Sequence, residues 1–131
     1  MVITEKNYVQ KAEEAILELK NRKDKRTGKT IPMVTTSKIR NLLAMTADIY
    51  NEVLGCREEK LGDEVCGRID YLKVRFLYEA GREPTVKSFV ETTDIMDCMD
   101  AIKGSKKNYI RFSRYMEALV AYHRFYGGRD N

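Results

Sequence analysis

The sequence predicts an all-α fold, a single compact bundle of five or six helices. Apolar residues recur at intervals of three and four along most of the chain, which is the spacing of one helix face. No stretch alternates apolar and polar residues long enough to favour a β-strand. The chain has 131 residues, the size of one domain, so we expect residues 1–131 to share one core without disulfides or metals.

The first helix is expected at residues 7–20, where the apolar positions fall on one side. A basic segment follows, with six Lys or Arg residues between positions 20 and 34 against the single acid Asp24. Gly28 and Pro32 disfavour a continuous helix through it. We therefore expect residues 21–34 to form a basic linker between the first and second helices, mobile in the absence of a ligand.

The second helix should begin just after the run of N-cap residue types at positions 35–37 and should end at Gly55. Its apolar positions cover a wide arc of the helical wheel. A wide arc predicts that the second helix is well buried.

The third helix should open at Gly62 and Asp63 and run to about Gly81. Val74 and Leu77 lie on one side of it and predict a neighbour there. The opposite apolar stripe predicts a partner helix and consists of Ile69, Leu72, Phe76 and Ala80. With contacts on two sides, the third helix is expected to be central in the bundle.

Three shorter or later helices complete the expected fold. Pro84 should break the third helix, and Thr85 is a candidate N-cap for a short fourth one. A fifth helix is expected at residues 94–103. The last should cover residues 106–126 and end at a pair of glycines suited to a left-handed C-terminal cap.

A row of arginines marks the third helix. Arg68, Arg75 and Arg82 recur every seven residues, so they share one side of the helix and span about 21 Å of it. Tyr71 and Tyr78 fall beside that row. Cations interleaved with aromatic side chains favour a surface that binds a polyanion.

An ordinary solvated face would show the same spacing. In that interpretation Glu79 pairs with Arg75 one turn away, and Glu83 pairs with Lys73 less closely. Such exposed pairs would each contribute only about a few tenths of a kcal/mol. Spacing alone leaves the two interpretations equal.

Two other helices carry candidate phosphate contacts. Lys38 and Arg40 fall in the first turn of the second helix, where the helix dipole normally favours acidic residues. Free backbone N–H groups and two cations would form a phosphate site, although both side chains could simply extend into water. Arg111 and Arg114 share one face of the last helix with Lys107, and either RNA or a neighbouring subunit could lie there.

The chain lacks the residue patterns of an enzyme. The single histidine, His123, falls among apolar residues, which favours a packed, hydrogen-bonded side chain over a general base. No metal, nucleotide or nucleophile motif is present, so we expect no cofactor and no metal. Three cysteines without a CxxC pair indicate a reducing cytoplasm, and no apolar run is long enough for a bilayer span.

Three segments carry a family resemblance: TTSKIRNLL at 35–43, YLKVRFLYEAGREPTVKSFVE at 71–91 and RYMEALVAYHRFYGG at 114–128. The chain resembles the small subunit of the type III-A CRISPR-Cas effector, the Csm complex. The resemblance implies a helical, non-catalytic protein that stacks in the minor filament and lines the guide RNA–target RNA duplex in antiviral defence. The implied partners are CRISPR guide RNA, target RNA, other Csm complex subunits and copies of the chain itself, with no membrane partner.

Carried onto this sequence, the resemblance assigns six RNA-contact positions: Lys38, Arg40, Arg75, Arg82, Arg111 and Arg114. Cleavage in that family belongs to other subunits. Duplex RNA is recognised through its backbone and 2′-OH groups, so we expect recognition of shape rather than sequence. Two other hypotheses remain open, a free-standing helical regulator that binds RNA or DNA and a protein-binding scaffold whose cations pair with acidic surfaces.

Overall fold

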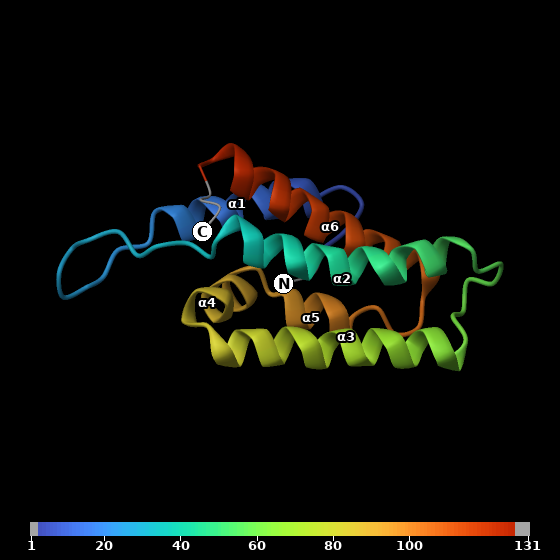
Figure 1. The fold of residues 1–131 in the computed structure, drawn as a ribbon. Helices are drawn as coiled ribbons and strands as arrows, with labels where there is room; N and C mark the ends of the chain where they lie inside the picture. Colours follow the sequence, from blue (N-terminus) through green and yellow to red (C-terminus); the bar gives the residue numbers. More distant parts are fainter. Residues whose placement is uncertain (1–2, 128–131) are drawn as a thin grey trace.

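The structure, a computed structural model, describes residues 3–127, and within them it contains six helices and no β-strand. The helices are α1 (Tyr8–Lys20), α2 (Thr36–Leu54), α3 (Asp63–Arg82), α4 (Pro84–Thr92), α5 (Ile95–Asp100) and α6 (Lys106–Phe125). Figure 1 shows them gathered in one elongated bundle. The predicted all-α bundle is confirmed.

The packing order places α2 between α6 and α3 (Figure 1). α6 packs against α1 on one side and against α2 on the other, whereas α3 packs against α2 and α4. Apolar side chains from all six helices meet in one core. Its largest fully buried rings are Phe76, Phe89, Tyr109, Phe112 and Tyr115.

α3 lies at the edge of the bundle, so its predicted central position is wrong. The stripe that includes Leu72 and Phe76 is buried as predicted, at 3% and 0% exposure. Val74 and Leu77 on the other side are 54% and 51% exposed. No helix of the described chain covers them, so α3 buries one apolar stripe and presents the other to the surroundings.

The junction between α3 and α4 forms at Pro84 itself, and the predicted cap at Thr85 is wrong. Pro84 is the first residue of α4, where its missing N–H would have no helical partner in any case. Glu83 before it has extended dihedral angles, as expected for a residue that precedes proline. The helix direction therefore changes within one residue of Arg82, the last residue of α3.

Two buried tyrosines tie separate elements together. The Tyr109 hydroxyl donates to the Thr46 carbonyl oxygen of α2 at 2.7 Å, and the Tyr115 hydroxyl donates to the Thr93 carbonyl oxygen at 2.9 Å. Burial raises the pKa of both phenols well above the usual value. Both hydroxyl groups therefore stay protonated and keep donating these hydrogen bonds, which fix the position of α6 against its neighbours.

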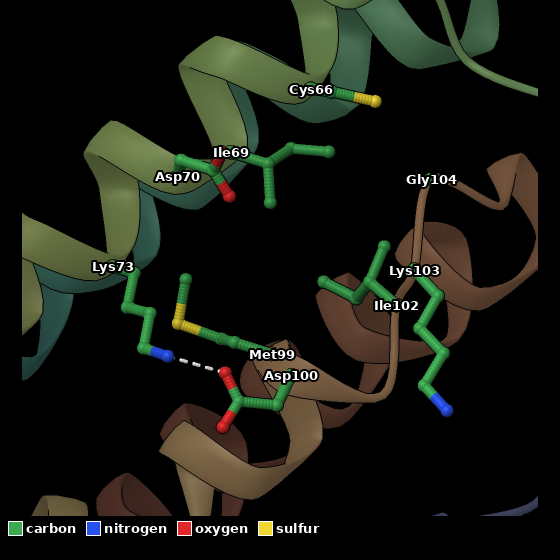
Figure 2. Close-up of a pocket in the computed structure, with 9 residues that line it drawn as sticks. All are labelled: Cys66, Ile69, Asp70, Lys73, Met99, Asp100, Ile102, Lys103 and Gly104. Atoms are coloured by element: carbon green, nitrogen blue, oxygen red, sulfur yellow. Dashed lines mark hydrogen bonds and ion pairs between the residues drawn. The ribbon is translucent and has the colours of Figure 1, made fainter.

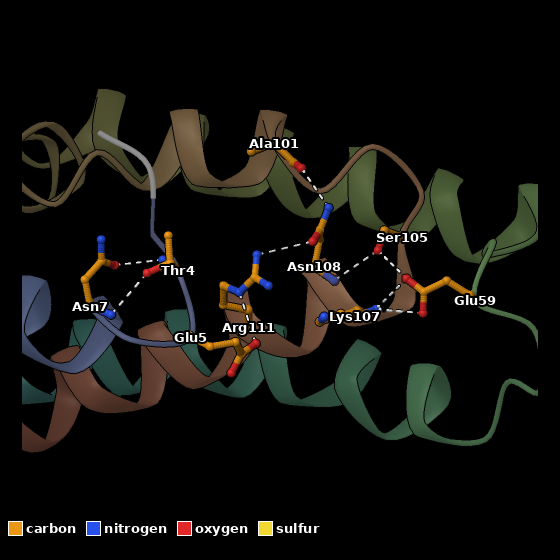
Figure 3. Close-up of polar contacts among 9 residues, drawn as sticks. All are labelled: Thr4, Glu5, Asn7, Glu59, Ala101, Ser105, Lys107, Asn108 and Arg111. Atoms are coloured by element: carbon orange, nitrogen blue, oxygen red, sulfur yellow. Dashed lines mark hydrogen bonds and ion pairs between the residues drawn. The ribbon is translucent and has the colours of Figure 1, made fainter.

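A carboxylate from a loop far away in sequence accepts hydrogen bonds from the N-terminus of α6. Glu59 accepts hydrogen bonds from the Ser105 hydroxyl at 2.5 Å and from the Lys107 backbone N–H at 3.2 Å (Figure 3). The Ser105 bond is the main cause that lowers the pKa of Glu59. A negative group here offsets Lys106 and Lys107 in the first turn and complements the helix dipole.

Residues 21–34 fold into a projecting hairpin. The C-terminal end of this segment, at Val34, contacts α6. The described turn contains the antiparallel pair Lys23 and Thr30, and Figure 1 shows it reaching beyond the helices. Its end is fixed at Val34, whose carbonyl oxygen lies 2.7 Å from Nε2 of the buried His123. The packed, hydrogen-bonded His123 is confirmed, while the mobility of residues 21–34 stays a prediction.

His123 should make the protein less stable as the pH falls below about 6.5. Burial lowers the pKa of its imidazole from 6.5, against the smaller opposing effect of the Val34 hydrogen bond. Just below pH 6.5, His123 therefore binds a proton in the unfolded chain but stays neutral in the folded chain. The free energy of unfolding should be highest above about pH 6.5 and fall by at most about 1.4 kcal/mol per pH unit until the folded pKa is reached.

Urea unfolding between neutral pH and about pH 5 would measure this effect. The lowered pKa values of Glu59 and Glu83 act below their ordinary value of 4.5, outside this window. The variant His123→Gln can keep a donor for Val34 but cannot take up a proton. A flat profile in the unmodified protein, or the same slope in the variant, would rule out His123 as the cause.

Candidate nucleic-acid interface

The open side of α3 carries the predicted row of arginines. Tyr78 lies one turn from Arg75 and one turn from Arg82, and both guanidinium carbons approach its ring, at 5.6 Å and 5.5 Å from the centroid. The ring is 55% exposed, and Tyr71, two turns before it, is 63% exposed. Guanidinium groups at such distances are attracted to the ring face. The result is a surface cluster in which cations and aromatic rings are held together.

Glu79 joins the two guanidinium groups of this cluster. Its Oε1 lies 3.9 Å from Arg75 Nη2 and 3.4 Å from Arg82 Nη1, which confirms the predicted pair with Arg75. A guanidinium has five N–H donors, so one shared carboxylate leaves most of them for another ligand. Exposed pairs of this kind contribute about 0–1 kcal/mol, and a phosphate could replace Glu79 at small cost.

Lys38 lies on the facing side of a groove between α2 and α3. Lys38 and Arg75 both line this groove, which has a volume of about 320 Å³. The Lys38 ammonium donates to Glu83 Oε2 at 2.8 Å, and this bond is the main cause that lowers the pKa of Glu83. The predicted pair of Glu83 with Lys73 is wrong. α3 ends before Glu83, so its carboxylate turns to α2, and Lys73 pairs with Asp100 instead.

The first turn of α2 does not bring Lys38 and Arg40 together. The backbone N–H of Lys38 already donates to the Thr35 hydroxyl at 3.4 Å. Two residues further on, Arg40 lies about 200° around the helix from Lys38 and is exposed. Arg40 has no ion pair with the described part of the chain. Lys38 therefore belongs to the groove, and Arg40 to the solvent face of α2.

Arg111 and Arg114 lie on α6, on the far side of α2 from the α3 cluster. Arg111 Nε donates to Glu5 Oε1 at 3.1 Å, and its Nη1 donates to Asn108 Oδ1 at 3.3 Å (Figure 3). The bond to Glu5 holds the segment before α1 against α6, and the bond to Asn108 lies within α6. Arg114, one turn later, is exposed. The structure thus gathers Lys38, Arg75 and Arg82, and it leaves the other three predicted contacts elsewhere.

Comparison with known proteins gives the family. The family model described as Csm2 Type III-A matches residues 8–129. The chain belongs to the Csm2 type III-A family. A relative in Streptococcus thermophilus, named CRISPR system Cms protein Csm2, is 42% identical over 129 residues, which are 98% of each chain.

Two further relatives carry the same name. The one in Enterococcus italicus is 39% identical over 120 residues, 88% of this chain and 86% of the relative. The one in Mycobacterium tuberculosis strain H37Rv is 36% identical over 97 residues, 74% of this chain and 78% of the relative. Csm2 is the small subunit of the type III-A CRISPR system, and membership of the family implies assembly with other Csm subunits.

Sequence reasoning found the pair of Glu79 with Arg75 but missed the partners of the other two carboxylates that organise the Csm2-family cluster. Glu79 and Glu83 each bind a predicted contact residue, and Glu52 of α2 pairs with Arg68 at the other end of the row. Only the Glu79 pair has a signal in the sequence, the helical spacing of three and four. The other two acids reach a different helix, so periodicity within one helix could not identify their partners.

A second hollow of this Csm2-family chain lies between α3 and the end of α5. Figure 2 shows Lys73 and Asp100 pointing toward one another across its edge, and they form an ion pair. Its volume is about 190 Å³, smaller than the 300–1,000 Å³ usual for a ligand pocket. Within residues 3–127 no group of three or more Cys, His, Asp or Glu side chains could hold a metal ion.

None of the helices described in this Csm2-family chain combines the length and the apolar character that a membrane crossing requires.

Proposed function

We propose that the chain is the non-catalytic small subunit that contacts the guide RNA–target RNA duplex of the type III-A effector in antiviral defence. Binding would use the phosphate backbone, because a subunit that serves any guide cannot depend on sequence. The proposed contacts are Lys38 and Arg75 in the α2–α3 groove, and Arg82 beside it. The further proposed contacts are Arg40, Arg111 and Arg114.

One observation carries this proposal: Arg75 and Arg82 share the exposed Tyr78 ring on a face that no other helix of the described chain covers. Ion pairs with Glu79 limit the rotation of both arginines. Less rotamer freedom then remains to be lost when a phosphate binds. The Tyr78 ring adds a flat surface that can meet a ribose or a base.

The proposal also includes stacking of several copies in the minor filament. Large apolar side chains remain exposed on α3 and at the end of α6, namely Val74, Leu77 and Phe125 at 54%, 51% and 78%. Val74 and Leu77, one turn apart on α3, form an exposed apolar surface that favours contact with another protein, and Phe125 is a separate exposed side chain at the end of α6. The same residues would support a protein-binding scaffold, so the test must separate RNA contact from assembly.

The double variant Arg75→Glu/Arg82→Glu should bind duplex RNA at least about tenfold more weakly, because two phosphate contacts become repulsive. The slope of log affinity against log salt should fall by about 1.4 to 1.8, from two lost phosphate contacts. Fluorescence anisotropy with the full chain and a labelled RNA duplex measures both quantities. Co-purification with tagged partner subunits measures assembly of the same variant.

The matched control is Arg75→Lys/Arg82→Lys, which keeps both charges and should keep most of the salt dependence. Circular dichroism should show the same helix content for all three proteins. If the Glu variant loses its partner subunits but binds RNA as before, the scaffold function is correct and this proposal is wrong. Strong preference of the unmodified chain for one RNA or DNA sequence would instead indicate a free-standing regulator.

A further inference from the structure

The hairpin at residues 22–31 has a defined backbone. The backbone N–H of Asp24 donates to the Lys29 carbonyl oxygen at 2.8 Å, and that of Ile31 donates to the Arg22 carbonyl oxygen at 2.8 Å. Gly28 closes the turn with a φ of +71°, a left-handed conformation that favours glycine. The segment is therefore a short hairpin arm with one antiparallel bridge, which Figure 1 shows projecting from the end of the bundle.

Positive charge on this arm is not neutralised within the described chain. The carboxylate of Asp24, its one acid, accepts hydrogen bonds from the backbone N–H groups of Arg26 at 2.7 Å and Thr27 at 3.3 Å. No ion pair of the described residues involves an arm cation. Five cations share the arm: Arg22, Lys23, Lys25, Arg26 and Lys29. Clustered cations with no internal partner favour binding to a polyanion.

The base of the arm borders a hollow that shares Lys38 with the α2–α3 groove. Thr30 and Ile31 of the arm line a hollow of about 860 Å³ together with Lys20 and Lys38. Lys38 also lines the α2–α3 groove with Arg75. The two hollows therefore meet at Lys38. Cations therefore lie on the arm, at Lys20 and Lys38 in the first hollow and at Arg75 in the second, with Glu83 as the acid paired to Lys38.

We infer that the hairpin arm is a second binding element for the RNA sugar–phosphate backbone, and that it extends the contact made in the α2–α3 groove. This inference rests on the proposed function. The arm contains no aromatic side chain at residues 22–31, so it has nothing on which a base could stack. It binds through charge alone and adds affinity without sequence preference.

The test compares two variants of equal charge. Lys25→Gln/Arg26→Gln/Lys29→Gln removes three cations from the arm and leaves the Asp24 hydrogen bonds in place. The control Lys6→Gln/Arg57→Gln/Lys60→Gln removes two lysines and one arginine at exposed positions outside the two hollows. Binding of each full chain to a labelled RNA duplex is measured over a range of salt concentrations.

The arm variant should lower the slope of log affinity against log salt by about 2.1 to 2.7, since each of the three lost phosphate contacts accounts for about 0.7 to 0.9. The control should stay close to the unmodified chain. If the arm variant matches the control while Arg75→Glu/Arg82→Glu weakens binding, the arm inference is wrong and the proposed function stands. If no variant changes RNA binding, both are wrong. If the arm variant loses partner subunits but binds RNA normally, the arm binds protein instead.

Discussion

Replacing Phe76 with alanine should lower the free energy of unfolding by about 3–5 kcal/mol. The ring is fully buried, and it lies at the centre of the stripe by which α3 packs against the bundle. Truncation removes apolar contacts and leaves a cavity that helices on both sides cannot fill completely. Urea unfolding followed by circular dichroism measures the loss.

Val74→Ala on the same helix is the matched control for Phe76→Ala. Val74 is 54% exposed, so its replacement should change the free energy of unfolding by about 0.5 kcal/mol or less. A similar loss in both variants would mean that the exposed stripe of α3 is covered in solution. In that case the isolated chain associates with itself, and the unfolding midpoint should depend on protein concentration.

Tyr109→Ala should be as damaging, with a loss of about 3–5 kcal/mol, because a fully buried ring leaves the interface of α6 with α2. The hydroxyl makes a second contribution through its 2.7 Å hydrogen bond to the Thr46 carbonyl oxygen. Tyr109→Phe keeps the ring and removes only that bond. This variant should lose about 0.5–1.5 kcal/mol in the same urea experiment.

The two Tyr109 variants together separate packing from hydrogen bonding. If Tyr109→Phe costs as much as Tyr109→Ala, the ring contributes little and the packing argument is wrong. The nearby ring of Phe112, with its centroid 5.7 Å away, is also fully buried. Phe112→Ala should therefore resemble Tyr109→Ala rather than Tyr109→Phe.

The periodicity of apolar residues was sufficient to predict the helices, because the residues on the buried face of each helix recur at spacings of three and four in the sequence. The expected helix at 106–126 corresponds to α6, and Phe112, Met116 and Leu119 on its inner side are fully buried. The expected helix at 7–20 corresponds to α1. The residues that end a helix also lie next to it in the sequence, so they could be identified in the same way. Gly127, with a left-handed backbone conformation, follows α6 as predicted.

Periodicity could not show what each exposed or charged side chain meets. Val74 and Leu77 formed a second apolar stripe, but no spacing rule tells whether the same chain covers it. Arg111 binds Glu5 across 106 positions of sequence, a contact that depends on how α1 packs against α6. The candidate site was therefore predicted as a set of cations, and only the fold separated the three at the groove from the other three.

The pairing of α1 with α6 also affects how the protein is made. Among the described helices, α1 is synthesised before the other five and packs mainly against α6, which is synthesised after them. Until α6 emerges, the apolar side of α1, including Ile16 and Leu19, lacks its main partner and can be covered only in part by α4. Folding of the complete bundle must therefore wait until α6 is synthesised, and a nascent chain that ends before α6 exposes an apolar surface that chaperones bind.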